Sequence, residues 1–131
     1  MIENEVLAII NRNSDSGMRL NSLADEFREG RDSNELLRLL YSDNSDLVRI
    51  GAWITGEIAF ELYNTPAFID RLKELTNHDI PAIRCYAFGA LYPSLVADEQ
   101  ETRDLIQKLQ QDDNEGVRLS ADAAARQLSI E

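Results

Sequence analysis

The sequence predicts an all-α fold, and three observations support this prediction. A short phrase of sequence recurs three times, with Val48, Ile83 and Val117 at equivalent positions 35 and 34 residues apart. Apolar residues that precede each copy recur with nearly the same spacing. No segment alternates apolar and polar residues over a useful length, as a half-buried strand would. A repeat of this length is typical of stacked helical hairpins.

Residues 1–30 are expected to form an N-terminal helical cap. They lack a full copy of the repeated phrase, and their apolar residues suit two helix faces. The two sets are Ile2, Val6, Ile9 and Ile10, and Leu20, Leu23, Ala24 and Phe27. Residues 11–17 are polar and are expected to form the turn between the two helices. A cap with a polar outer face keeps the end of a helical stack soluble.

Residues 31–64 are expected to form the first of three helical hairpins. Ser33 is a candidate N-cap for a short helix that ends near Tyr41. A polar turn over 43–46 then leads into a longer helix that reaches about Leu62.

Residues 65–97 are expected to form the second hairpin. Thr65 followed by Pro66 suits an N-cap and a first helical turn. Pro81 is expected to begin the partner helix, and Pro93 is expected to end it because the proline ring clashes with the preceding turn.

Residues 98–131 are expected to form the third hairpin, with helices over about 98–110 and 114–128. The three hairpins and the cap then make one continuous domain. Small residues on the second helices, Gly51, Gly56 and Gly89 among them, are expected to let neighbouring helices approach closely.

The repeated phrase resembles the second helix of HEAT repeats. Each copy has Val-Arg or Ile-Arg followed by Ala, and the resemblance covers residues 31–131. It implies an α-α superhelix of about three helical hairpins. It also implies that the repeated arginines pair with aspartates in the turns of neighbouring repeats. The residues expected in these pairs are Arg49, Arg84, Arg118, Asp43, Asp79 and Asp112.

The composition limits the kinds of partner. The 131 residues include 24 acidic and 13 basic side chains, for a net charge of −11 that is spread almost evenly along the chain. Such a charge repels nucleic acid and favours a cationic protein partner. The acidic N-terminus and the absence of an apolar run of about 18 residues predict a soluble, cytoplasmic protein without a membrane segment.

Catalysis, metals and cofactors are not expected. The single cysteine, Cys85, and the single histidine, His78, are too few for a zinc site, and nothing in the sequence suggests a third group that would orient them as a nucleophile and base. Paired acids at 98–99 and 112–113 stand at expected helix starts, where the helix dipole favours negative charge.

Residues five and nine positions after the repeated Val or Ile are expected on the concave side of the stack. Together with Glu61 they suggest an aromatic patch flanked by carboxylates, a combination suited to binding protein. The expected partner-binding residues are Trp53, Glu57, Glu61, Phe88, Tyr92 and Asp122. An equally weighted alternative is that Trp53, Phe88 and Tyr92 fill the space between repeats.

These observations predict a non-catalytic protein-binding module. Small acidic HEAT-like proteins include immunity proteins, so the resemblance implies binding and neutralisation of a basic, nuclease-type toxin domain. The alternative is a HEAT-repeat adaptor or assembly factor for a larger enzyme complex.

Overall fold

The computed structural model describes residues 1–11, 15–58 and 65–130, and within these ranges the protein is all-helical, as predicted. The chain runs through eight α-helices and one short 3-10 helix in the described ranges. They are α1 (Ile2–Ile10), α2 (Ser16–Arg28), α3 (Asn34–Leu40), α4 (Ser45–Glu57), α6 (Pro66–Leu75), α7 (Pro81–Leu91), η1 (Tyr92–Ser94), α8 (Gln100–Gln110) and α9 (Glu115–Gln127).

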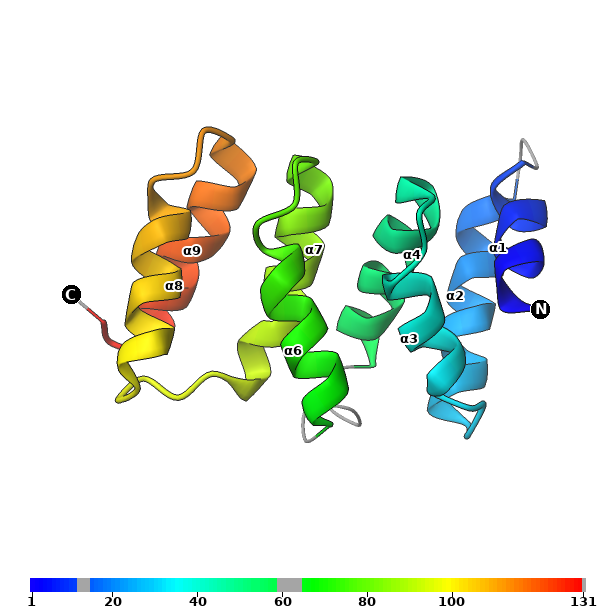
Figure 1. Cartoon of the computed structure of the whole chain (residues 1–131), viewed down its shortest axis with the longest axis horizontal. Coiled ribbons are helices and arrows are strands. Elements are labelled where there is room, and N and C mark those ends of the chain that lie inside the picture. The colour runs from blue at the N-terminus through cyan, green and yellow to red at the C-terminus, as the bar shows by residue number, and fades with distance from the viewer. Residues whose placement is uncertain (12–14, 59–64, 131) are drawn as a thin grey trace.

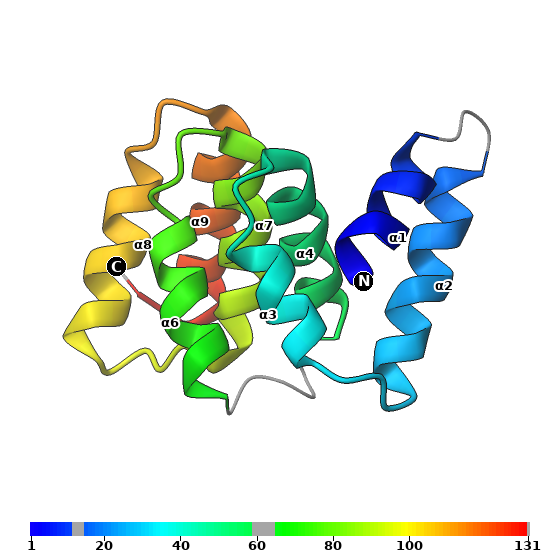
Figure 2. The same ribbon diagram turned by 45° about the vertical axis from the view of Figure 1, so that its right-hand side comes forward.

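The helices form successive pairs along the long axis of the molecule. α1 packs on α2, α3 on α4, α6 on α7 and α8 on α9, and the two termini lie at opposite ends (Figure 1). Between pairs, α4 packs on α7 and α7 on α9, while α3 contacts α6. The first helices α3, α6 and α8 therefore make one layer and the second helices α4, α7 and α9 another (Figure 2). These contacts are consistent with a helical superhelix, and the division into repeats at 64/65 and 97/98 stays a prediction.

Prolines set helix boundaries where the sequence predicted them. Pro66 and Pro81 occupy the first turns of α6 and α7, where the missing N–H would have no helical partner anyway. α7 ends at Leu91, and Pro93 lies in the 3-10 turn that follows. The first helical pair differs from the prediction, because α4 ends at Glu57 with Ile58 as its C-cap, earlier than the expected end near Leu62. Residues 59–62 themselves lie outside the described residues.

Side-chain caps are asparagines at two of the turns. Asn44 Oδ1 accepts the N–H of Asp46 before α4, and Asn114 Oδ1 accepts the N–H of Val117 before α9. Ser33 does occupy the N-cap of α3, but its side chain makes no capping bond.

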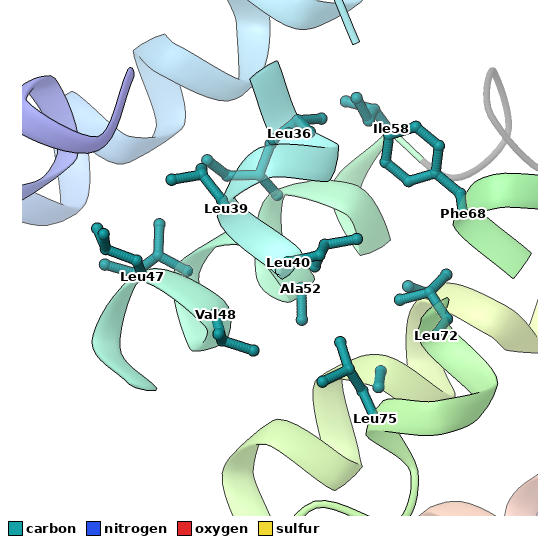
Figure 3. Packing of buried hydrophobic residues seen from close by; sticks show 14 of the residues in the cluster. Leu36, Leu39, Leu40, Leu47, Val48, Ala52, Ile58, Phe68, Leu72 and Leu75 are labelled. Carbon is teal, nitrogen blue, oxygen red and sulfur yellow. The ribbon is translucent and has the colours of Figure 1, made fainter. Parts of the chain in front are cut away.

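The main apolar core joins the helices from α1 to α7. Figure 3 shows Leu40 of α3 and Ala52 of α4 on the side toward Leu72 and Leu75 of α6, and Phe68 pointing toward Ile58, which directly follows α4. Close packing at Gly51 is confirmed, because a Cβ there would lie 2.8 Å from the Leu39 Cβ. A second cluster joins Phe88 of α7 to α8 and α9. No described helix is long and apolar enough to cross a membrane.

Arg31 links the N-terminal pair of helices to α3 through ion pairs. It lies between α2 and α3, and its guanidinium donates to Glu5 of α1 at 2.6 and 3.0 Å and to Glu35 of α3 at 2.7 and 3.2 Å. The same group reaches Glu26 and lies 5.3 Å from the ring centre of Phe27. Because Arg31 is only 18% exposed, this network joins α1, α2 and α3 at a partly desolvated point.

Candidate functional site

The second-helix layer contains a hollow between α7 and α9. We call it the α7/α9 groove; it encloses about 330 Å³, and most of its lining is apolar. Its lining residues are Phe88 and Gly89 from α7, Tyr92 from η1, and Ser120, Ala123, Ala124 and Gln127 from α9. Small side chains leave this space open, since a Cβ on Gly89 would have no neighbouring atom within 4 Å. The prediction that Gly89 allows close helix packing is therefore wrong, because it faces open space.

Phe88 of α7 and Tyr92 at the start of η1 lie on the side that faces α9. Phe88 is 2% exposed and belongs to the apolar cluster that α7 shares with α8 and α9. Tyr92 is half-buried, its ring centre lies 6.3 Å from that of Phe88, and its hydroxyl donates to Gln127 Oε1 at 3.2 Å. The expectation of an exposed Phe88 is wrong, because the position points toward the next helical pair. Of the two open interpretations, filling the space between helical pairs is the one that describes Phe88.

The other predicted contact residues do not join Phe88 in one patch. Trp53 is half-buried and packs against the main core. Glu57 is exposed, and Arg28 donates both to its carbonyl at 3.1 Å and to its carboxylate at 3.4 Å. Asp122 accepts a hydrogen bond from Gln110 at 3.1 Å, which places it toward α8. Glu61 lies outside the described residues.

One of the predicted arginine–aspartate pairs between neighbouring turns is present. Arg84 donates to both carboxylate oxygens of Asp112, at 2.8 and 2.9 Å, and also reaches Asp113. Its Nη1 donates to the carbonyls of His78 and Asp79, so Asp79 contributes its backbone and not its carboxylate. The pair is 12% and 10% exposed.

The other two repeated arginines do not form the expected bridges. Arg118 donates to the carbonyl of Asp112 at 2.7 Å, six residues earlier, just as Arg84 does to His78. Arg49 instead approaches Asp46 at 3.8 Å within its own helix. Asp43 forms no ion pair with any described residue. The difference arises because Arg49 is 40% exposed and is not enclosed between two turns as Arg84 is.

Two of the carboxylates that pair with arginine, Asp112 and Glu5, have lowered pKa values. Burial alone would raise the pKa of Asp112, but hydrogen bonds from Arg84 and from the Asn114 N–H outweigh burial and hold that pKa below its usual value. Hydrogen bonds from Arg31 likewise lower the pKa of Glu5. Both groups therefore stay charged and serve the fold.

The potentially reactive side chains have ordinary structural partners. Cys85 Sγ lies 3.5 Å from Ser120 Oγ, at the contact between α7 and α9. His78 Nδ1 accepts the N–H of Ile80 at 3.0 Å. In the described ranges no group of His, Cys, Asp and Glu side chains is arranged to hold a metal ion.

Sequence reasoning missed most of the α7/α9 groove. Gly89, Ser120, Ala123 and Gln127 line it, and only their helical spacing on two facing helices could have indicated it. Comparison with known proteins finds no matching family model, no matching curated protein and no matching solved structure.

Proposed function

We propose that the protein is a non-catalytic module that binds a basic protein partner, and specifically an immunity protein that neutralises a nuclease-type toxin domain. The observation that carries this proposal is the balance of unpaired charge. Among described residues, carboxylates without an ion pair outnumber cations without one. The carboxylates are Glu29, Asp32, Asp43, Asp70, Asp79, Asp98, Glu99, Asp104, Glu115 and Asp122; the cations are Arg103, Lys108, Arg118 and Arg126.

Many of these free carboxylates lie in the turns between helices, where water and a partner can reach them. The paired acids, such as the enclosed Asp112 and the more exposed Glu5, are already neutralised by arginines of the same chain. The remaining negative field accelerates encounter with a cationic protein and weakens as salt is added. A stoichiometric inhibitor of a nuclease needs these properties, because its carboxylates take the place of phosphates.

The α7/α9 groove supplies an apolar contact within this acidic surface. Protein interfaces concentrate binding energy in a few side chains that enter well-packed pockets, while charged residues at the rim tune the rate of association. A groove lined by Tyr92, Gly89 and Ala123 among others suits one apolar side chain of the partner. A contact at this point does not require any catalytic group.

The test begins with a pull-down at low salt and mass-spectrometric identification of the captured protein. The proposal expects a basic nuclease-type domain, together with rescue of cells that express that domain. Capture of a larger enzyme complex without rescue would favour an adaptor or assembly role and overturn the immunity function.

The Gly89→Leu variant then tests the groove. The new side chain enters open space and replaces a mid-helix glycine, so the fold should be as stable or more stable, by up to about 1 kcal/mol. Partner affinity should fall at least tenfold. Gly17→Leu on α2 is the matched control, since a Cβ there also meets no atom within 4 Å and Gly17 lies far from the groove in the chain. Equal affinities for the two variants would remove the groove from the interface.

A further inference from the structure

A second and longer hollow runs between the first helices α6 and α8, on the layer opposite the α7/α9 groove. One part, of about 310 Å³, is bounded by α6, the end of α7 and the start of α8. Another part, of about 620 Å³, lies between the α6–α7 and α8–α9 turns. Both parts are lined by Thr76, Asn77 and Lys108, so they lie side by side. We call the two parts together the first-helix groove.

One end of the first-helix groove has an apolar floor. Leu91 is fully buried beneath it, and Ile69, Leu95 and Leu105 are partly buried around it. Such a floor can hold an aliphatic side chain of a ligand.

The same end contains a threonine hydroxyl that a ligand can reach. Thr102, in the first turn of α8, is 2% exposed, and its side chain makes no hydrogen bond with any described residue. Thr76 is buried to the same degree but donates to the Lys73 carbonyl at 2.6 Å. In the described ranges no fully enclosed side-chain oxygen or nitrogen lacks a hydrogen-bond partner, so the Thr102 oxygen must reach the surface of the groove, where it can bind a polar atom of a ligand.

The walls of the first-helix groove carry a net negative charge. At one end Lys73 of α6 bridges the groove to Glu101 of α8 at 2.8 Å, and at the other Arg84 is paired with Asp112. These pairs neutralise themselves. The lining carboxylates without an ion pair are Glu99, Asp104 and Asp79, against one unpaired ammonium group, that of Lys108.

We propose that the first-helix groove binds an extended cationic peptide segment of the partner. Its lysine or arginine side chains would meet the carboxylates that lack an ion pair, and an apolar side chain would lie on the floor near Leu105. The Thr102 hydroxyl would hydrogen-bond to the peptide backbone. The Lys73–Glu101 contact shows that the groove wall already holds an ammonium group beside a carboxylate. This inference rests on the proposed function, because it names the part of a basic partner that the protein recognises.

Lys108 provides a test in which binding should improve. It is the unpaired cation of the groove, so Lys108→Glu should replace a repulsion with an attraction and tighten binding. Arg126→Glu is a closely matched control. Both residues are exposed, both lie in the last turn of their helices, neither has an ion pair, and Arg126 lines neither part of the groove.

The probe is a nine-residue peptide of alternating Lys and Leu with a fluorescent label, titrated into the full chain and followed by anisotropy. Lys108→Glu should lower the Kd of the peptide about three- to tenfold, because the changed charge lies in the groove and acts at short range. Arg126→Glu should lower it less than twofold, because salt screens a distant charge. Thr102→Val, which keeps the shape and removes the hydroxyl, should raise the Kd about three- to tenfold. Amide NMR shifts should map to α6 and α8.

Equal effects of the two charge changes, or NMR shifts confined to α7 and α9, would overturn the inference. Absence of peptide binding would overturn it too. The proposed function is tested separately. If a basic toxin domain is captured and cells are rescued from it, the function stands. If Lys108→Glu and Thr102→Val then leave the affinity for that domain unchanged, this groove is not the binding site. If no basic partner is captured, the function itself fails.

Discussion

The Arg84→Met variant should weaken the junction between the last two helical pairs. Arg84 makes the strongest polar contact there, with two bonds to Asp112, one to Asp113 and two to backbone carbonyls of the α6–α7 turn. Methionine keeps much of the volume and loses every one of these bonds. Asp112 would then remain as a carboxylate with only 10% of its side chain exposed and no cation bonded to it, since Arg118 donates to the Asp112 backbone carbonyl.

The size of the loss follows from burial and bond count. Leaving one member of a buried ion pair without its partner costs about 3–5 kcal/mol, and a surface pair contributes about 0–1 kcal/mol. Because Asp112 lies in a turn and keeps the Asn114 N–H at 2.9 Å, we expect a loss near 2–4 kcal/mol. Asp112→Asn should cost less, since the amide oxygen can still accept that N–H. The variant that carries both Arg84→Met and Asp112→Asn should be less destabilised than the sum of the two single variants, with a coupling free energy of about 1.5–3 kcal/mol.

Urea unfolding followed by far-ultraviolet circular dichroism measures these free energies. Repeating the unfolding at several pH values adds a second test, because the pKa of Asp112 is lowered in the folded protein. The stabilisation from ionised Asp112 is complete above the ordinary aspartate pKa of about 3.9 and is lost as the pH falls through the pKa of the folded state. The difference between wild type and Arg84→Met should therefore shrink below about pH 4. A coupling under about 0.5 kcal/mol at neutral pH would show that the pair behaves as an exposed one and would refute the reasoning.

Other variants test single contacts. Phe88→Ala should cost about 3–5 kcal/mol in urea unfolding, whereas an exposed contact residue would cost under about 1. Gly51→Ala should destabilise the fold despite the better helix propensity of alanine, because the new Cβ would lie 2.8 Å from the Cβ of Leu39. Gly17→Ala, where a Cβ meets no atom within 4 Å, should stabilise the fold by about 0.4–1 kcal/mol. Arg31→Met should speed amide exchange in α1 at neutral pH; unchanged exchange would show that apolar packing alone holds the N-terminal helices.

The sequence predicted helix positions well wherever local chemistry decides them. Pro66, Pro81 and Pro93 act through fixed backbone geometry, which does not depend on tertiary context. Asn114 marks the start of α9 by the same kind of local effect. Arg49 was harder to place, since its partner depends on how far apart two turns lie, and that distance is a property of the whole stack.

Prediction of the candidate site was weaker, and α7 shows why. Arg84 is the only charged residue between Pro81 and Leu91, so the hydrophobic pattern of this helix does not identify an outer face. α7 packs against α4, α6 and α9, and its side at Phe88 is covered by α9. A helix enclosed on three sides requires knowledge of its neighbours before an exposed residue can be assigned.

The two grooves differ in chemistry, and salt should separate their contributions to partner binding. The α7/α9 groove is lined by small and apolar groups, so a contact there should change little with ionic strength. The first-helix groove depends on exposed carboxylates such as Glu99, whose attraction is screened as the Debye length falls from about 10 Å at 0.1 M salt to 3 Å at 1 M. Gly89→Leu should therefore lower partner affinity by the same factor at every salt concentration. Lys108→Glu should raise affinity mainly at low salt and steepen the salt dependence. A Gly89→Leu effect that vanished at high salt would mean that the groove acts through nearby charge and not through apolar contact.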